Sequence, residues 1–582
     1  MQAYTFDRAI AGAFVRFAGG FWRGPTATRA WTLTIGLALC LTASTAVTVG
    51  VNRWQRWFFD ALERKDAETA SLAVLVFLGL IALTAAIGVG IVLTRETLQV
   101  RWRAYLVEKL VGVWIGNNRF YHLAATHTEP DNPEYRISDD TRWATEPLTD
   151  LVIGAFSAII GAAAFISILW SVGGSYALKL GGATLTIPAY MVLVALAYGA
   201  IASGLMMWIG RALVGCVARK NASEGEFRFA LMRMRENAES VALMGGAASE
   251  QRTLTGLYDV VVQRWLALVR QHGRLTWVTN SSGPMIPIVP LLFAAPKYFS
   301  GEFTLGEVVQ LAAAFVQVQL AISWIVDNYN RLAEWFASAR RVMDIVDAGE
   351  ALDTRIACLG DGRIALKPSA DGALRIHAVE VTDTAGRTLV AADGLSIPAG
   401  AHVHVHGSTS AGKSSLVKAI SALWPWGRGR IEVPAGARVM VVPQKPYLPT
   451  GTLRHALLYP DPSTAVSEAD VQRVLADAGL AHLAPRLDQV ERWDQMLGNG
   501  ERQRLCLARV LIHKPEVVVL DDALAALDEA AQESLEAVIA KRLPKATLIS
   551  LSQRPRPVSG GLMRFELVRG EKWAKVQAVA AV

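Results

Sequence analysis

Six apolar stretches lie within the first 330 positions of this 582-residue chain. A helix needs about 20 residues to cross the hydrocarbon core of a bilayer, which is roughly 30 Å thick. We therefore expect transmembrane helices near residues 31–52, 71–94, 151–172, 187–209, 276–296 and 306–326. Hydrophobic residues make up 52% of the chain and charged residues only 19%, a balance that favours a membrane protein over a soluble enzyme.

The fifth stretch carries four prolines, at positions 284, 287, 290 and 296. A helix interrupted in this way is expected to kink, and its freed carbonyls need protein or water partners. Two interpretations stay open: a helix that lines a substrate cavity, and a locally irregular helix packed in the bundle. At the start of the sixth stretch, Thr304 and Glu307 have capping-box spacing, which favours a helix cap over an intramembrane carboxylate.

Residues 1–30 are expected to form an N-terminal cytoplasmic segment, without the apolar core and cleavage site of a secretory signal. Within it, residues 4–22 predict a helix whose apolar side carries Phe6, Ile10, Phe14, Phe17 and Phe21. Such a helix fits a membrane surface, and equally a position against the first transmembrane helix. The four cysteines are far apart in the sequence and predict neither a disulfide framework nor a zinc site.

Basic residues are unevenly shared between the two sides of the predicted membrane domain. Residues 1–30, 95–150 and 211–275 together hold 21 Lys and Arg, whereas 53–70, 173–186 and 297–305 hold 6. Cytoplasmic connections carry the basic excess, so both termini are expected in the cytoplasm. The net charge of +7 is scattered rather than clustered, which gives no indication of a nucleic-acid partner.

The character of the chain changes after residue 330. We expect a six-helix membrane domain over 31–340, a connector over 341–373 and a soluble domain over 374–582. In the soluble domain, helical stretches alternate with the β-rich runs RIHAVEV, AHVHVHG, ARVMVVP, EVVVLDD and ATLISLS. This alternation predicts an α/β domain with a largely parallel sheet.

The run AHVHVHG leads into a phosphate-binding loop. The string GSTSAGKSS fits the pattern GxxxxGK[ST] between a strand and a helix. Glycines let backbone N–H groups wrap phosphates, Lys413 can balance the charge of the β- and γ-phosphates, and Ser414 can bind Mg²⁺. The expected ATP-binding residues are Gly407, Ser408, Thr409, Ser410, Ala411, Gly412, Lys413, Ser414 and Ser415.

A second motif, EVVVLDDALAALDE, places Asp521 at the end of an apolar strand. A buried strand that ends in two acids is costly, and P-loop enzymes use a carboxylate at this place to hold the metal shell. Between the two motifs lie VVPQKPYLPTGTL, with Gln444 after a strand, and LGNGERQRLCLARVL, a turn that enters a basic helix.

In order and spacing these motifs resemble the ABC ATPase family. The resemblance assigns Walker A to 407–414, the Q-loop to Gln444, the signature to 497–501, Walker B to 517–521 and the end of the D-loop to Asp528. Further strings look like the branch that holds peroxisomal fatty-acyl transporters and bacterial SbmA/BacA-like transporters with a fused ATPase. These strings are ALWPWGRGRIEVP, PQKPYLPTGTLRHALLYP, NRWQRWFFDALERKD and DNPEYRISDDT.

The resemblance implies an exporter-type ABC fold, in which a membrane helical bundle precedes a C-terminal α/β P-loop ATPase domain. It implies a half-transporter that dimerises in a bilayer, here the bacterial inner membrane, and binds ATP and Mg²⁺. Its cargo would be bulky and amphipathic, of the peptide, cobalamin or acyl-CoA type. The implied site residues are Ser414, Gln444 and Asp521 for the metal, Asp522, Gln553 and Gln444 for catalysis, and Leu497, Gly498, Asn499, Gly500 and Glu501 for the signature.

The sequence departs from the family pattern at the ATP site. Asp522 replaces the usual glutamate, and a carboxylate one methylene shorter must reach farther toward the attacking water. Gln553 replaces the switch histidine and has no titratable proton. Residues 497–501 read LGNGE where the family has LSGGQ, and residues 376–386 lack the aromatic residue that often stacks on adenine.

These departures leave two arrangements open: a slow homodimer, and a heterodimer in which this chain supplies the weak half of one ATP site. In both, we expect the chain alone to bind Mg-ATP and hydrolyse it slowly. An ion-coupled secondary transporter is an alternative, because SbmA-type relatives work without an ATPase, although the first four spans contain no residue suited to carry a proton. A regulatory subunit is another, and the direction of transport stays open.

Overall fold

The computed structural model describes residues 8–180, 183–408, 411–523, 527, 529–553, 562–569 and 574–578. The chain divides into two compact units, Met1–Asn117 with Glu129–Ala348, and Asn118–Thr128 with Gly349–Val582. The first unit is mostly helical, and the second contains the large β-sheet. The short segment Asn118–Thr128 belongs to the second unit although it lies among the membrane helices in the sequence.

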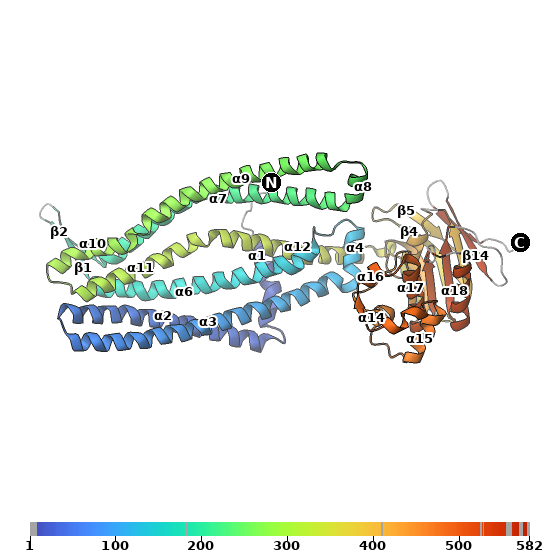
Figure 1. Ribbon diagram of the computed structural model, residues 1–582, viewed down its shortest axis with the longest axis horizontal. Helices are drawn as coiled ribbons and strands as arrows, with labels where there is room; N and C mark the ends of the chain where they lie inside the picture. Colours follow the sequence, from blue (N-terminus) through green and yellow to red (C-terminus); the bar gives the residue numbers. More distant parts are fainter. Residues whose placement is uncertain are drawn as a thin grey trace. The chain divides into compact units, whose positions relative to one another are not determined.

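Within the described residues, six helical segments are long and apolar enough to cross a membrane, and they coincide with the six predicted spans. Figure 1 shows α2 beside α3, and α7 beside α9, as two pairs; α11 packs against α6 and α2. The helices of this unit are α1 (Arg8–Ala18), η1 (Gly19–Trp22), α2 (Ala27–Glu63), α3 (Ala67–Ile115), α5 (Pro133–Tyr135), η3 (Arg136–Asp140), α6 (Thr141–Gly173), α7 (Tyr190–Glu236), α8 (Ala238–Leu243), α9 (Ala247–Ser282), α10 (Met285–Phe299), α11 (Leu305–Asp327) and, up to Ala348, α12 (Tyr329–Ala357).

The predicted interruption of the fifth span lies between α9 and α10. Helix α9 ends at Ser282 and α10 begins at Met285, with Gly283 and Pro284 between them. Tyr198 of α7 donates its hydroxyl hydrogen to the Ser282 carbonyl at 2.6 Å. A side chain of a neighbouring helix therefore satisfies a carbonyl at the break, as a low-dielectric bilayer requires.

The start of α11 confirms the predicted capping box. The Glu307 N–H donates to Thr304 Oγ1 at 3.2 Å, and the Thr304 N–H donates to Glu307 Oε2 at 3.0 Å. The fourth span begins later than predicted, at Tyr190 rather than residue 187. The reason is an antiparallel hairpin of β1 (Ser175–Leu180) and β2 (Ala183–Pro188), in which Ile187 pairs with Tyr176.

The N-terminal helix α1 packs against other helices of its own unit. Phe14 is fully buried and its ring meets Trp335 of α12 edge-on, with centroids 6.0 Å apart. Trp102 of α3 donates its indole N–H to the Ala18 carbonyl at 3.2 Å. These contacts favour the packed helix over the membrane-surface helix, and Phe6 lies outside the described residues.

A buried ion pair joins α12 to the turn before α6. Asp140 is 0% exposed. Arg341 donates from Nε to Asp140 Oδ2 at 2.7 Å and from Nη2 to Oδ1 at 2.6 Å. This bidentate arrangement supplies both carboxylate oxygens with charge-assisted hydrogen bonds, which a buried acid requires.

The second unit is built on a mixed sheet. The strands are β3 (Ala365–Ser369), β4 (Leu374–Thr382), β5 (Thr388–Ala392), β6 (Leu395–Ile397), β7 (His402–Gly407), β8 (Gly427–Pro434), β9 (Val439–Val442), β12 (Val517–Asp521), β13 (Thr547–Ser552), β14 (Met563–Arg569) and β15 (Ala574–Ala578), with β10 (Gly451–Thr452) and β11 (Val490–Glu491) in a separate pair. The block β9–β12–β13–β7–β14 is parallel, whereas β4 pairs antiparallel with β5, β6 and β8. The prediction of a largely parallel sheet is therefore confirmed for the block of strands that carries the predicted nucleotide motifs.

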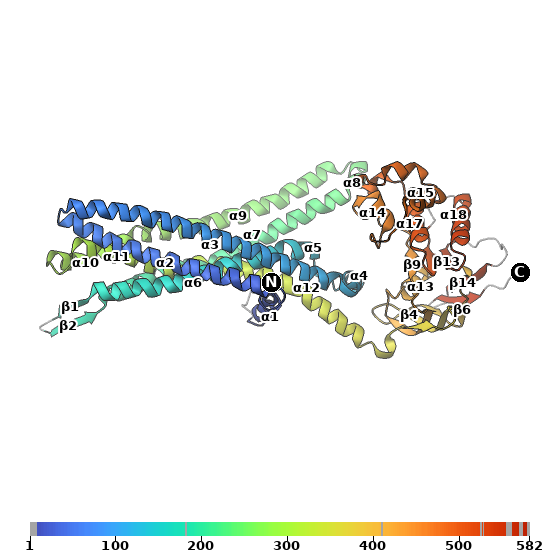
Figure 2. The ribbon, with the colours of Figure 1, turned by 90° about the horizontal axis from the view of Figure 1, so that it is seen from below.

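A helical cluster forms a second layer of this unit. Its core contains Leu475, Trp493 and Leu505, and Figure 2 shows α14, α15 and α17 grouped together. The helices of the unit are α4 (Arg119–Ala125), α13 (Lys413–Ile420), α14 (Leu453–Leu458), α15 (Glu468–Asp477), α16 (Trp493–Met496), α17 (Asn499–His513) and α18 (Glu529–Arg542).

The stretch predicted as a connector, residues 341–373, contains regular structure. Helix α12 continues to Ala357, and β3 begins at Ala365, before the predicted start of the soluble domain at residue 374. Val342, Ile345 and Val346 are buried. Their spacing continues the helical period, which the intervening charged and small residues obscure in the sequence.

We predict that Arg341→Met destabilises the protein, because it leaves the Asp140 carboxylate buried without its partner. Loss of one member of a fully buried pair costs about 3–5 kcal/mol, and the partial exposure of Arg341 reduces this to about 2 kcal/mol. Thermal unfolding in detergent measures the effect. Arg340→Met is the control on the same helix, and equal melting temperatures for the two variants would contradict the prediction.

Candidate functional site

The loop predicted to bind phosphates joins β7 to α13, so the predicted order of strand, loop and helix is confirmed. Gly407 ends the strand and Lys413 begins the helix. Gly412 has a φ of +84°, a left-handed conformation that glycine adopts without strain. A Cβ at Gly407 would lie 2.9 Å from Leu567 Cβ, and a Cβ at Gly412 would lie 2.9 Å from Val390 Cβ. Both positions therefore require glycine, and the loop can pass close to the sheet.

Lys413 points back under the loop. It is 7% exposed, and its ammonium donates to the Gly407 carbonyl at 2.5 Å and the Ser408 carbonyl at 3.1 Å. Phosphate oxygens would replace these carbonyls as stronger acceptors, since charge-assisted hydrogen bonds are about twice as strong as neutral ones. Of the other predicted loop residues, Ser408 is exposed, Ala411 is buried and Ser415 is half-buried, whereas Thr409 and Ser410 lie outside the described residues.

The two predicted metal-binding side chains of the loop and the strand meet. Ser414 Oγ donates to Asp521 Oδ1 at 3.3 Å. Burial raises the pKa of the Asp521 carboxyl, and the charge of Asp522 adds to this, while the hydrogen bond from Ser414 opposes it. A hydroxyl and a carboxylate side by side fit Mg²⁺, which prefers oxygen ligands. A divalent cation here would relieve the cost of a buried carboxylate.

The predicted catalytic acid, Asp522, sits at a special backbone position. Its φ is +47°, and its N–H donates to the Leu551 carbonyl at 3.1 Å. Asp and Asn adopt the left-handed region several-fold more often than most other residues. Gln553 is exposed and follows the last residue of β13. Strand β13 lies next to β12, so both residues follow the ends of neighbouring parallel strands.

Gln444 lies in the exposed segment after β9, two residues beyond the strand. A buried arginine connects this segment to α17. Arg509 donates to the Tyr447 carbonyl at 2.9 Å and to the Ala456 carbonyl at 2.7 Å. Burial lowers the pKa of Arg509. One side chain therefore holds the segment after β9 and the helix α17 together.

The predicted signature residues belong to the helical cluster rather than the sheet core. Leu497 is buried in that cluster, and Asn499 and Gly500 begin α17. Glu501 Oε2 accepts from the Gly498 N–H at 3.0 Å, and Glu501 Oε1 lies 3.0 Å from His482 Nε2. The structure thus brings Lys413, Ser414 and Asp521 together but places 497–501 in a different layer; Asp528 lies outside the described residues.

The sequence analysis missed a set of contacts around α4. Arg119 Nε donates to Asp353 Oδ1 at 3.1 Å, and His122 Nε2 lies 2.8 Å from the Leu423 carbonyl oxygen. The hydrogen bond from Arg119 lowers the pKa of Asp353. The His122 ring also meets Trp426 edge-on, at 5.5 Å. No local pattern marks these residues, because the partners are 234 and 301 positions apart.

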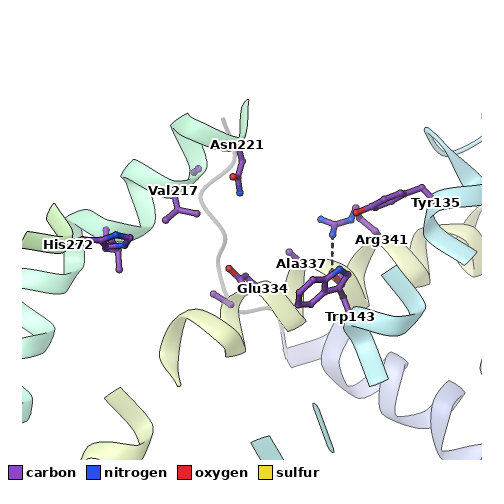
Figure 3. Close-up of a pocket in the computed structure, with 12 residues that line it drawn as sticks. Tyr135, Trp143, Val217, Asn221, His272, Glu334, Ala337 and Arg341 are labelled. Atoms are coloured by element: carbon purple, nitrogen blue, oxygen red, sulfur yellow. Dashed lines mark hydrogen bonds between the residues drawn. The ribbon is translucent and has the colours of Figure 1, made fainter. Parts of the chain in front are cut away.

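A cavity of about 510 Å³ lies in the helical unit. Figure 3 shows Val217 and Asn221 of α7 on one side of it and Glu334 and Ala337 of α12 on another. The walls combine apolar, aromatic and polar side chains. The lining residues are Tyr135, Trp143, Leu213, Val217, Ala218, Asn221, His272, Ala333, Glu334, Ala337, Ser338 and Arg341.

Two known families match this chain. The family described as ABC transporter transmembrane region 2 matches residues 24–299, and the family described as ABC transporter matches residues 392–525. The second match includes the phosphate-binding loop, the signature and Asp521.

Several similar proteins align with most of this chain. The inner membrane ABC transporter ATP-binding protein YddA of Escherichia coli is 26% identical over 88% of this chain and 89% of its own length. An uncharacterized ABC transporter ATP-binding protein of Haemophilus influenzae is 28% identical over 79% of this chain and 76% of its own. The ABC transporter D family member 2 of Arabidopsis thaliana, a chloroplastic protein, is 27% identical over 93% of this chain and 84% of its own length.

A solved bacterial Atm1-family ABC exporter with ATP bound has the same fold. The two structures superpose with a TM-score of 0.67 at 18% sequence identity. The superposition covers 92% of this chain and 93% of the exporter chain. The chain therefore combines six apolar helices with a C-terminal ABC ATPase domain in the fold of an Atm1-family ABC exporter, which is the arrangement of an ABC half-transporter with a fused ATPase.

Proposed function

We propose that this chain uses ATP to move a bulky amphipathic cargo across a membrane, as one half of a dimer with a degenerate ATP site. The observation that carries the proposal is the Ser414–Asp521 contact beside a buried Lys413, in the same chain as six candidate spans. The basic excess of the long connections supports an orientation with both termini in the cytoplasm. The match to an Escherichia coli inner membrane protein supports the same location here.

In the proposed site, the backbone of 407–415 and Lys413 bind the phosphates. Ser414, Gln444 and Asp521 surround the metal, and Mg²⁺ there supplies charge neutralisation at the phosphates. Asp522, Gln444 and Gln553 orient the attacking water. Residues 497–501 complete the site of the partner subunit, which agrees with their position in a layer separate from the loop.

A second half-transporter is the proposed partner of the α7–α9 hairpin. At its tip, Leu243 is 81% exposed and Met244 is 78% exposed. Exposed apolar residues of this size at one tip mark an interaction surface. Either an identical chain or a different half-transporter could cover this surface. The altered residues 497–501, Asp522 and Gln553 favour a different partner that carries the usual ABC residues at these positions.

The cavity in Figure 3 is the proposed place where cargo contacts this half. Its apolar and aromatic walls suit a large apolar body, and Asn221, His272 and Glu334 suit a polar part. This combination supports an amphipathic cargo, whether of the peptide, cobalamin or acyl-CoA type. His272 and Glu334 are also the titratable groups that the alternative, an ion-coupled transporter, would need.

Flux into liposomes tests the proposal. We expect ATP-dependent transport of a labelled peptide, cobalamin or acyl-CoA by the chain with its partner half, and none with Lys413→Ala, because the phosphates lose their cation. Transport that survives Lys413→Ala and is stopped by a protonophore would replace the proposal with ion-coupled transport. ATP hydrolysis without flux of any cargo would support a regulatory subunit instead.

The purified chain alone should bind Mg-ATP and hydrolyse it slowly, because Asp522 is one methylene short and misplacements of this size cost orders of magnitude in rate. Asp522→Glu should raise the turnover about tenfold or more, with a small loss of thermal stability at the left-handed position. Phosphate release and thermal unfolding measure the two effects. Brisk hydrolysis by the unaltered homodimer would refute the degenerate site, and an unchanged rate in the variant would point to Gln553 or 497–501.

Asp521→Asn should raise the melting temperature of the nucleotide-free protein at neutral pH. Burial raises the pKa of Asp521 above the ordinary value of 3.8, so the folded state binds its proton more tightly. The contribution of the Asp521 carboxyl to folding stability therefore falls as the pH rises from 3.8 through the raised pKa. Replacing the carboxylate with an uncharged amide removes this loss of stability. The same variant should lose the extra stabilisation that Mg²⁺ adds to ATP. Asp494→Asn is the control, and Mg²⁺-dependent stabilisation in Asp521→Asn would exclude Asp521 as a ligand.

A further inference from the structure

A groove in the α7–α9 pair lies apart from the residues proposed above. It holds about 760 Å³ and is lined by Trp208, Ile209, Ala212, Arg270, Gln271, Gly273, Arg274 and Trp277. On α9, the positions 270, 273, 274 and 277 follow helical spacing and share one face. His272 lines the Figure 3 cavity instead, so the groove uses a different face of the helix.

Two arginines give the groove its positive charge. Arg270 and Arg274 are both exposed, and no described carboxylate oxygen lies within 4.0 Å of either guanidinium. Gln271 is 4% exposed; it donates to the Ile209 carbonyl at 2.5 Å and accepts from Arg274 Nη1 at 3.4 Å. This buried amide joins the two helices at the floor of the groove and holds the Arg274 guanidinium at its edge.

The groove lies where the apolar parts of both helices end. The predicted spans end at residue 209 on α7 and begin at residue 276 on α9. Trp208 is 69% exposed and Trp277 is 74% exposed, and tryptophan is enriched at the boundary between hydrocarbon and water. Arg270 and Arg274 precede Trp277 on α9, on the side of the membrane that the basic excess of the long connections predicts to be cytoplasmic.

An apolar stripe continues from the groove into the membrane span. Ile201 is 72% exposed and Leu205 is 41% exposed, and with Trp208 they occupy positions i, i+4 and i+7 of α7. A ligand with an anionic head and long apolar chains matches both parts, since its head meets the arginines and its chains follow the stripe. A free phosphate matches only the arginines.

We propose that this groove binds an anionic phospholipid of the cytoplasmic leaflet, whose phosphate accepts hydrogen bonds from Arg270 and Arg274. Arginine suits this role because its planar fork binds phosphate oxygens in pairs. Basic pockets between transmembrane helices on the cytoplasmic side are suited to acidic lipid heads. This lipid site is distinct from the nucleotide site, and lipid binding here does not depend on which cargo the transporter carries.

Gly273 allows the groove to be filled without removing charge. A Cβ at this position meets no described atom within 4 Å. Gly273→Leu therefore adds a side chain into open space, and replacing glycine inside a helix favours the helix. The variant should fold, and its effect on lipid binding should come from steric exclusion alone.

Native mass spectrometry of the full-length protein in detergent tests the proposal, with phosphatidylglycerol, phosphatidylcholine and glycerol phosphate as probes. We expect tight binding of phosphatidylglycerol only. Arg270→Ala with Arg274→Ala should weaken it about 25-fold, since each basic side chain near an anionic lipid surface contributes about fivefold. Gly273→Leu should also weaken it, whereas Arg264→Ala, an equal loss of charge on α9 outside the groove, should leave it unchanged.

Three results would overturn the proposal. Equal binding of phosphatidylcholine would make the groove a general apolar surface, and equal binding of glycerol phosphate would make it a free-anion site. A shift from dimer to monomer in the double arginine variant, with phosphatidylglycerol still bound, would assign the groove to the second subunit. The same spectra report both lipid and subunit stoichiometry, and ATPase activity is not needed for either result.

Discussion

Backbone groups inside a bilayer have no water to bind, and the membrane half of this protein follows from that constraint. The spanning segments are helices of 37, 49 and 47 residues in α2, α3 and α7, longer than the roughly 20 residues that a bilayer requires. Helices of this length continue out of the membrane and carry their loops with them. Where the backbone breaks, at Ser282, the hydroxyl of Tyr198 supplies a hydrogen bond from a neighbouring helix.

Helix α4 and the end of α12 belong to the second unit, although each directly follows helices of the first unit in the sequence. Arg119 of α4 binds Asp353 of α12, so two segments that leave the membrane domain are tied together within the ATPase unit. His122 contacts the carbonyl of Leu423, three residues after the eight-residue helix α13 that begins at Lys413. The short helix α13 therefore separates Lys413 from the point where α4 packs.

Two residues at which the chain departs from the ABC ATPase pattern occupy positions that suit them structurally. Asp522 occupies a left-handed backbone position that a short polar side chain tolerates. Glu501 stabilises the start of α17 by accepting from Gly498, a role that glutamate fills at the third position of a helix. Asp522 and Glu501 therefore each have a structural role within the chain.

The sequence by itself determined the six spans, the strand–loop–helix around Lys413 and the strand that ends at Asp521. These features depend on local rules: the length of apolar runs, glycine at strained positions, and continuous apolar strands in a parallel sheet. The kink at Pro284 and the cap at Thr304 followed from the same rules. The predicted start of a connector at residue 341 was wrong, because α12 continues to Ala357. The apolar face of this helix can be recognised only when its packing partners are known.

Only the tertiary structure decided which distant residues meet. The Ser414–Asp521 contact joins residues 107 positions apart, and those of Arg119 and His122 span 234 and 301 positions. The groove between α7 and α9 likewise needs both helices before its arginines and tryptophans form one surface. Spacing along a chain reports the face of one helix or strand, whereas a contact depends on how elements pack, and packing is set by surfaces contributed from the whole unit.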